Sequence, residues 1–186
     1  MKIIAGVDEV GRGSLIGPVY AAAVILNKSI EKKLLRDSKR LSKKKREILS
    51  NYIKKNSTWS IGKASVKEID KMNILKASLL AMKRAIIKLK KKPTIIFVDG
   101  NMLPEINNYK LKSIIKGDEK IPSISAASII AKVTRDKIIT KLSKKFKGYK
   151  WDQNFGYGTK KHLNAIKNLG ITSLHRKTFS PMNKQK

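Results

Sequence analysis

Two short apolar segments of this chain each run directly into acidic residues. Residues 2–7 lead into Asp8 and Glu9, and residues 94–98 lead into Asp99. Both segments have the length and composition of buried strands in a sheet whose connections are helices. In such sheets, ligands bind beyond the carboxyl ends of the strands. The pattern therefore predicts an α/β fold in which two strands bring carboxylates to the same edge of one sheet.

The remaining apolar patterns complete this fold. Early segments follow one another like hairpin neighbours and later ones alternate with helical patterns, which favours a mixed, five-stranded sheet flanked by helices. Further strands are expected at residues 19–26, 58–66 and 112–116, and helices at residues 43–55, from Asp70 or Asn73 to about residue 89, from Ser123 or Ser125 to about residue 145, and at residues 160–168. We expect one domain over residues 1–186, with residues 146–186 as a short helical C-terminal extension that packs on it.

The composition excludes several function classes and favours one kind of partner. The 186 residues include no cysteine, which excludes disulfides, zinc–thiolate sites and cysteine catalysis. No apolar run approaches the roughly 20 residues that a membrane span needs, and no secretory signal is evident, so we expect a cytoplasmic protein. The formal net charge of +30 favours a polyanion as partner, although lysine-rich solvated faces account for part of it.

The acidic residues fall into two groups. Surface ion pairs or helix termini explain most of the 13, and Asp136 is expected to form a solvated pair in mid-helix. Asp8 and Asp99 end apolar strands, where an unpaired charge is costly, so a cation or a nearby arginine must compensate them. Glu9 can share a site with them only if the strand ends or twists there, and Asp118 is also explained as a turn residue.

An all-oxygen ligand set suits Mg²⁺ or Mn²⁺, and Mg²⁺ sites are usually completed by waters and substrate phosphates. Together with the basic chain, such a set predicts phosphoryl transfer on nucleic acid, with two ions at the attacking and leaving oxygens. Two alternatives remain open: a non-catalytic basic protein that coats nucleic acid, and a metal-dependent nuclease of the same fold that cuts DNA. His162 and His175 are expected to be structural donors, although His175 and Arg176 could contact phosphate.

A series of motifs resembles the bacterial ribonuclease HII family over nearly the whole sequence. The matching segments are residues 5–13 with 17–18, 37–42, 73–75 with 81–82, 98–100, 116–118, 125–136, 156–159 with 162–163, and 175–176 with Phe179 and Pro181. Each segment alone is weak, but their order and spacing together are specific.

This resemblance implies a ribonuclease-H-like layered fold and an endonuclease. The enzyme would cut the RNA strand of RNA/DNA hybrids, including single ribonucleotides embedded in duplex DNA, and leave 3′-hydroxyl and 5′-phosphate ends. By the same resemblance, the catalytic, metal-binding residues are Asp8, Glu9, Asp99 and Asp118, and the cofactor is Mn²⁺ or Mg²⁺ in a two-ion site. A monomer is expected.

The resemblance also implies substrate contacts. The backbone of Gly11, Arg12 and Gly13 would contact the ribose 2′-hydroxyl, which distinguishes RNA from DNA. Tyr157 would pack against the deoxyribose that follows the ribonucleotide. Phe155 departs from the family pattern, which more often has lysine at this position. Candidate phosphate contacts are Lys39, Lys132, Arg135 and Arg176.

Overall fold

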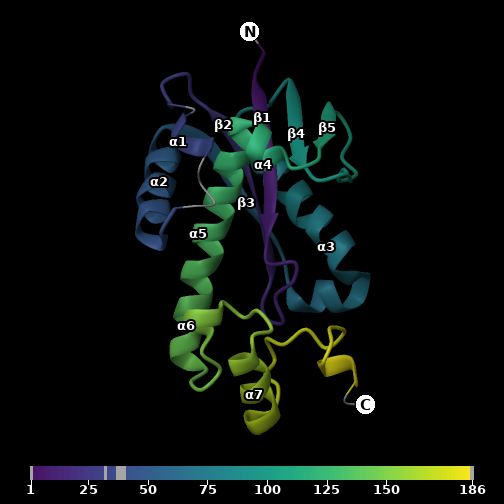
Figure 1. Cartoon of the computed structure of the whole chain (residues 1–186). Helices are drawn as coiled ribbons and strands as arrows, with labels where there is room; N and C mark the ends of the chain where they lie inside the picture. Colours follow the sequence, from purple (N-terminus) through teal and green to yellow (C-terminus); the bar gives the residue numbers. More distant parts are fainter. Residues whose placement is uncertain (1, 32, 37–40, 185–186) are drawn as a thin grey trace.

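Five strands form one mixed sheet in the computed structural model of the protein, which describes residues 2–31, 33–36 and 41–184 (Figure 1). The strands are β1 (Ile4–Val10), β2 (Val19–Leu26), β3 (Ser57–Ala64), β4 (Ile95–Asp99) and β5 (Leu111–Ile114). They lie in the order β3-β2-β1-β4-β5. The pairs β1–β2 and β2–β3 are antiparallel, whereas β1–β4 and β4–β5 are parallel. The predicted mixed sheet of five strands is therefore confirmed.

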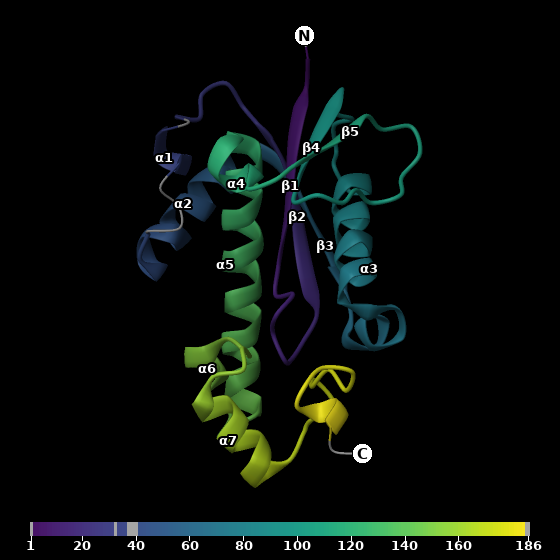
Figure 2. The same cartoon turned by 45° about the vertical axis from the view of Figure 1, so that its right-hand side comes forward.

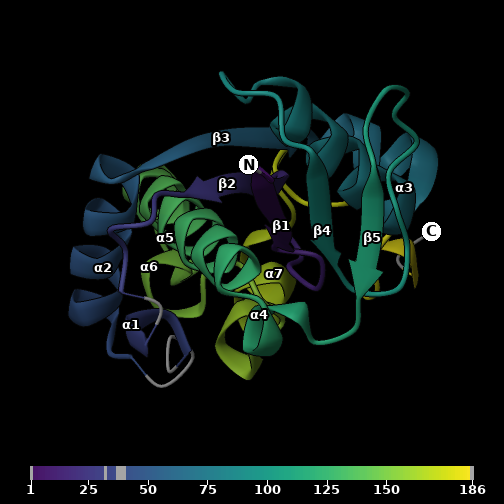
Figure 3. The same cartoon turned by 90° about the horizontal axis from the view of Figure 1, so that it is seen from above.

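Helices cover both faces of this sheet (Figures 1 and 3). Helix α3 (Val66–Ile87) packs on one face, and α5 (Pro122–Lys145) packs on the other. Beside α5 lie α2 (Lys43–Lys55) and the short α1 (Lys33–Arg36). Helix α2 begins, as predicted, at the N-cap Ser42, whose side chain accepts a hydrogen bond from the backbone of Lys45. In the described part of the chain, no helix is long and apolar enough to cross a membrane.

The start of α5 approaches β1 closely because small residues meet there. A side chain at Gly6 would overlap the backbone of Ser123 and Ile124. Ala126 and Ala127 follow in the next turn and are fully buried. This close packing holds the following turns of α5 above the end of β1, where the acidic residues lie.

Helix α3 begins earlier than the sequence predicts. Ser65 and Glu68 form a capping box at its true start, whereas the prediction placed the start at Asp70 or Asn73. Asn73 interrupts the helix with a φ of 70°. Its side-chain oxygen accepts hydrogen bonds from the backbone of Leu75 at 2.9 Å and of Lys76 at 3.1 Å. Asn73 therefore caps a second helical segment, which is the part that the apolar periodicity had predicted.

Residues after α5 form a small helical layer at the end of the sheet opposite the N-terminus (Figure 2). It contains α6 (Trp151–Asn154), α7 (Lys160–Leu169) and the 3₁₀ turn η2 (Met182–Lys184). Apolar side chains of this layer pack against Leu15 and Ile16, which follow β1. The predicted helical C-terminal extension is present, and it contacts the loop that leaves the acidic end of β1.

Both histidines lie in this layer and are buried. His162 accepts a hydrogen bond from the indole N–H of Trp151 at 2.9 Å. His175 accepts one from the backbone of Thr172 at 2.8 Å. The two rings are 5.5 Å apart between centroids and pack with Tyr149 and Trp151. Both histidines are therefore part of the packing of this layer, although in these two hydrogen bonds they accept rather than donate as predicted.

Candidate active site

The pairing of β1 with β4 brings two carboxylates together. In this parallel pair, Val7 lies opposite Val98, so the next residues, Asp8 and Asp99, are level with each other. Neighbours at the same level of a sheet point to the same face. Val7 and Val98 pack into the core beneath α3, which leaves Asp8 and Asp99 on the face covered by α5.

Asp8 is almost completely enclosed, with 6% of its surface exposed. Ser128 of α5 makes a side-chain hydrogen bond to its carboxyl group, and Oδ1 accepts a bond from the backbone N–H of Glu9 at 2.7 Å. Burial raises the pKa of Asp8 well above its usual range, and the negative charges of Glu9 and Asp99 raise it further. The local environment thus holds more negative charge than the protein itself neutralises.

Glu9 belongs to the same cluster. Burial raises the pKa of Glu9 as well, and Asp99 adds to this, while Arg12 lowers it. The guanidinium Nη1 of Arg12 lies 3.3 Å from Oε1 of Glu9. Arg12 is half exposed, so this ion pair offsets only part of the charge in the cluster.

The fourth acidic residue follows a tight turn beside Asp99. The backbone N–H of Gly117 donates to Oδ1 of Asp99 at 2.6 Å, and Asp118 is the next residue, in the short helix α4 (Gly117–Lys120). A side chain at Gly117 would lie 2.6 Å from Cδ1 of Ile124 and 3.2 Å from this carboxylate oxygen. A larger residue at position 117 would crowd Ile124 and Asp99, so glycine favours the close approach of this turn to Asp99.

These residues have the chemistry of a site for a hard divalent cation. All the donors are carboxylate oxygens; burial first, and then the charges of Glu9 and Asp99, raise the pKa of Asp8, and a cation at this place would favour its charged form. Within the described residues, however, no three His, Cys, Asp or Glu side chains are already arranged to hold a metal ion. The cluster is therefore an open set of ligands, in which one oxygen of Asp99 is engaged by Gly117.

The loop that follows β1, residues 11–16, is called the β1 loop below. Arg12 and Gly13 are exposed, and Tyr157 lies alongside, because Ser14 and Tyr157 form a β-bridge. A Cβ on Gly13 would lie 3.9 Å from the Tyr157 ring. The predicted substrate-contacting residues Arg12, Gly13 and Tyr157 thus lie together on an accessible edge.

Gly11 differs from the sequence-based expectation that its open backbone faces a ligand. It is buried, with a φ of +92°, and a side chain there would overlap the guanidinium of Arg135. The missing side chain of Gly11 therefore makes room for Arg135 inside the protein. Gly100, which follows Asp99, has no atom within 4 Å of the position of a Cβ.

Arg135 and Arg176 are buried completely, which contradicts their predicted role as direct phosphate contacts. Arg135 donates to the carbonyl oxygen of Phe155 at 3.0 Å and to Oγ of Ser14 at 2.6 Å. Arg176 donates to the carbonyl oxygens of Gly17 at 3.0 Å and Arg12 at 2.8 Å. Burial lowers the pKa of both guanidinium groups, that of Arg176 to about 9. They were predicted to contact phosphate because the sequence gives the charge of a side chain but not how far it is buried.

Lys132 is the predicted phosphate contact that stays accessible. Its ammonium lies 3.0 Å from Asp136, 4.9 Å from the ring centroid of Phe155 and 5.9 Å from that of Tyr157. Asp136 is buried, so its predicted place in a solvated pair is wrong. Its carboxylate pairs with the Lys132 ammonium, which lies beside the Tyr157 ring. Lys39 lies outside the described residues.

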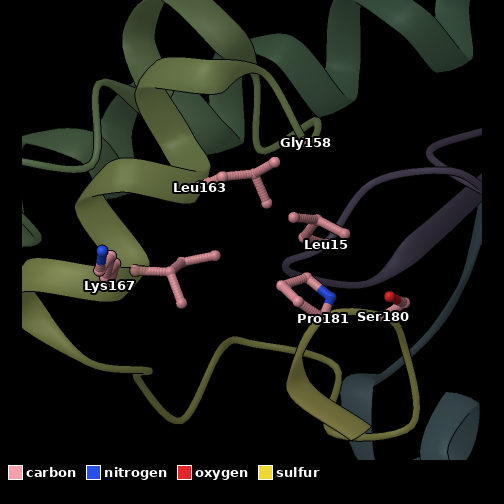
Figure 4. A pocket seen from close by; sticks show the side chains of 7 residues that line it. Leu15, Gly158, Leu163, Lys167, Ser180 and Pro181 are labelled. Carbon is pink, nitrogen blue, oxygen red and sulfur yellow. The ribbon is translucent and has the colours of Figure 1, made fainter. Parts of the chain in front are cut away.

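A pocket of about 600 Å³ lies next to the β1 loop (Figure 4). Leu15, Gly158, Leu163 and Pro181 are among its lining residues. None of the lining residues is acidic, so the pocket offers no ligands for a metal ion.

Comparison with known proteins places the chain in one family. The family profile described as ribonuclease HII matches residues 5–182. The chain belongs to the ribonuclease HII family. It is 74% identical over 182 residues to the ribonuclease HII of Pelagibacter ubique (strain HTCC1062), with 98% of each chain covered. The protein is therefore a ribonuclease H enzyme.

Solved structures agree with the ribonuclease HII assignment. The crystal structure of the ribonuclease H2 from Pyrococcus horikoshii OT3 is similar with a TM-score of 0.80 and 29% identity, over 97% of this chain and 95% of that one. The crystal structure of Bst-RNase HIII in complex with Mn²⁺ has the same fold, with a TM-score of 0.77 and 18% identity, over 98% of this chain and 68% of that one. The ribonuclease-H-like fold is confirmed.

Ser14 and Ser128 are the site residues that sequence reasoning missed as hydrogen-bond partners. The run of small residues at 125–128 predicted close packing, and that packing is what lets Ser128 reach Asp8. Nothing in the sequence distinguishes Ser14 from an ordinary loop serine. Its role depends on Arg135, which is 121 residues away in the chain.

Proposed function

We propose that this ribonuclease HII hydrolyses the RNA strand of RNA/DNA hybrids and cuts duplex DNA at single embedded ribonucleotides, leaving 3′-hydroxyl and 5′-phosphate ends. The observation that carries the proposal is the pairing of Val7 with Val98, because the residues that follow them, Asp8 and Asp99, then end up together near the exposed Arg12 and Gly13. It combines a carboxylate cluster with an open backbone on the same edge of the sheet. A protein that only coats nucleic acid has no use for the buried carboxylates.

In this proposal, Asp8, Glu9, Asp99 and Asp118 are the catalytic residues and hold Mg²⁺ or Mn²⁺. With substrate present, two such ions would supply a nucleophile at neutral pH and stabilise the charge on the departing 3′ oxygen. The protein's part is to keep these carboxylates close together in a largely enclosed place. Ser128 fixes the orientation of Asp8, and Gly117 fixes that of Asp99. No histidine acts as a base, because both histidines are buried in the C-terminal layer.

We assign recognition of the substrate's sugars to the β1 loop and Tyr157. The main chain of Arg12 and Gly13 would recognise the ribose 2′-hydroxyl, the group that separates RNA from DNA, whereas Gly11 supports this loop from inside the protein. Tyr157 would pack against the neighbouring deoxyribose. Gly13 supports this role because it leaves the backbone uncovered beside the tyrosine ring.

Phosphates would be bound by lysines, namely Lys39 and Lys132, and by the net charge of +30, which attracts nucleic acid over a distance. We propose that the protein acts on its duplex substrate as a monomer. Light scattering at working concentrations tests this point.

The decisive assay compares three duplexes: DNA that contains one ribonucleotide, the same sequence made only of DNA, and an RNA/DNA hybrid. Each is incubated with Mg²⁺, with Mn²⁺ or with chelator, and the cut positions and end groups are mapped. We expect metal-dependent cuts in the two duplexes that contain ribonucleotides and none in the all-DNA duplex. Cuts in the all-DNA duplex would instead support a DNA nuclease, and binding without cutting would support a coating protein.

A further inference from the structure

The β1 loop is joined on both sides to segments from the C-terminal part of the chain. On one side, the backbone N–H of Leu15 donates to the carbonyl oxygen of Gly156 at 2.8 Å. On the other, the backbone N–H of Arg176 donates to the carbonyl oxygen of Leu15 at 2.9 Å, and that of Gly17 donates to Leu174 at 2.8 Å. The loop therefore lies between the Tyr157 segment, defined here as residues 155–158, and residues 174–176.

Ser14 is the centre of the first junction. Its hydroxyl lies 3.1 Å from the carbonyl oxygens of both Ile16 and Gly156, and it can donate to one of them at a time. The same oxygen accepts from Nη2 of Arg135 at 2.6 Å. Because Arg135 also donates to the carbonyl oxygen of Phe155 at 3.0 Å, one side chain from α5 holds both the β1 loop and the Tyr157 segment.

Arg176 makes the second junction. Its Nε donates to the carbonyl oxygen of Gly17 and its Nη1 to that of Arg12, so it spans the β1 loop from end to end. The carbonyl of Arg12 belongs to the peptide that leads into Gly13. The orientation of this exposed peptide is thus set from inside the protein by a side chain of the C-terminal layer.

Holding a loop with two buried guanidinium groups carries a large desolvation cost. The partners that the structure gives them in the described residues are carbonyl and hydroxyl oxygens, with no carboxylate in contact. Each charge still costs several kcal/mol to remove from water, and well-packed apolar side chains would often be no less stable. The arginines contribute a defined geometry, because one planar guanidinium donates hydrogen bonds to several oxygens in fixed directions.

We propose that Arg135, Ser14 and Arg176 are positioning residues that hold the β1 loop and the Tyr157 segment in one fixed arrangement, and that this arrangement sets the discrimination between ribose and deoxyribose. The inference rests on the proposed function of these two segments. It assigns the arginines no contact with substrate. It also makes the C-terminal layer a determinant of specificity, through Arg176.

Three variants test this inference: Ser14→Ala, Arg135→Lys and Arg176→Lys. The serine variant removes one hydroxyl with little change in volume, so it preserves folding if an arginine variant does not. Arg84→Lys is the matched control, because Arg84 binds the carbonyl oxygen of Lys63 at 2.9 Å and Glu68 at 2.7 Å on α3, away from this region. Folding is checked by thermal unfolding.

The first readout needs no activity. Amide hydrogen exchange is followed by mass spectrometry in peptides that cover residues 11–16 and residues 155–158. We expect each of the three variants to raise exchange in both peptides together, and the control to raise it in neither. Faster exchange in one peptide alone would overturn the coupling. Because this readout uses the free protein, it decides the coupling even if the wild-type enzyme cuts neither substrate and the proposed function fails.

The second readout is the ratio of kcat/KM for a duplex with one ribonucleotide to kcat/KM for a long RNA/DNA hybrid. A purely structural defect lowers both values in proportion. Positioning residues should lower the first value at least about fivefold more than the second, because misplacement by a fraction of an ångström weakens recognition of a single sugar most. An unchanged ratio in variants whose two peptides exchange faster would overturn the link to specificity.

Discussion

Nη1 of Arg176 donates a hydrogen bond to the carbonyl oxygen of Arg12 at 2.8 Å. The guanidinium of Arg12 in turn lies 3.3 Å from Oε1 of Glu9. A buried residue near the C-terminus is therefore two contacts away from the carboxylate cluster. The proposed catalytic residues and the proposed substrate-contacting residues are therefore linked through Arg12.

Asp8→Asn should reduce turnover by about 1,000-fold or more, which corresponds to about 4 kcal/mol of activation free energy, because a central metal ligand is lost. Affinity for the duplex should stay the same or rise, since a negative charge near the phosphates is removed. Single-turnover kinetics and a binding titration without metal measure both effects. Asp152→Asn, in an exposed position, is the control and should behave like wild type. Full activity of the Asp8→Asn variant would refute the assignment.

Gly11→Ala and Gly13→Ala should distinguish a glycine that the fold requires from a glycine that is proposed to contact the substrate. At Gly11, the positive φ and the overlap with Arg135 should destabilise the fold by about 2 kcal/mol or more. At Gly13, the nearest atom to an added Cβ is 3.9 Å away, so stability should change little. Gly13→Ala should nevertheless lower cleavage at a single ribonucleotide, because the backbone that reads the 2′-hydroxyl is covered. Urea unfolding and the cleavage assay together test the pair; equal stability losses would contradict it.

Lys132→Met should weaken duplex binding and reduce the slope of log K against log salt by about one, as expected for the loss of one phosphate contact. The ion pair with Asp136 and the two nearby rings hold this ammonium in place beside Tyr157. Lys90→Met is the control, because Lys90 precedes β4 at the end opposite Asp99 and should leave the slope unchanged. An identical slope for the Lys132→Met variant and wild type would exclude the contact.

His175 should make the fold sensitive to mild acid. Burial lowers the pKa of His175 to about 4, and the neighbouring His162 contributes, while the ordinary value is 6.5. As the pH falls from 6.5 towards 4, the unfolded chain takes up a proton that the folded protein does not, so stability falls by up to about 3 kcal/mol. His175→Gln should lose less stability across this range than wild type. Urea unfolding at pH 7.5, 6 and 5 checks the difference, and parallel curves for the two proteins would contradict it.

The strands and the acidic edge could be predicted from sequence because their signals are local. An apolar run ending in a carboxylate identifies β1 and β4, and their parallel pairing then follows from the fold. The burial of three charged residues could not be predicted, since a charged residue on a helix or in a tail is usually exposed. These residues are Arg135, Asp136 and Arg176. Their burial depends on how the C-terminal layer packs against the loop after β1, which is a long-range property.

The start of α3 was missed for a different reason. Apolar periodicity begins after Asn73, and the preceding turns carry little of it, so the capping box of Ser65 and Glu68 was the only local sign. Asn73 itself was correctly predicted as a helix start, but of the second segment. Capping chemistry, rather than hydrophobicity, determines where this helix begins.

Ser128 and Arg135 are seven residues apart on α5, and so lie two turns apart on the same side of the helix, about 10 Å along its axis. Ser128 touches Asp8, whereas Arg135 touches Ser14 and Phe155. One helix therefore fixes the distance between the contact with the carboxylate cluster and the contacts with the β1 loop and the Tyr157 segment. Inserting a single residue between Ser128 and Arg135 would turn one of these contacts away by about 100°, so the length of this stretch is constrained.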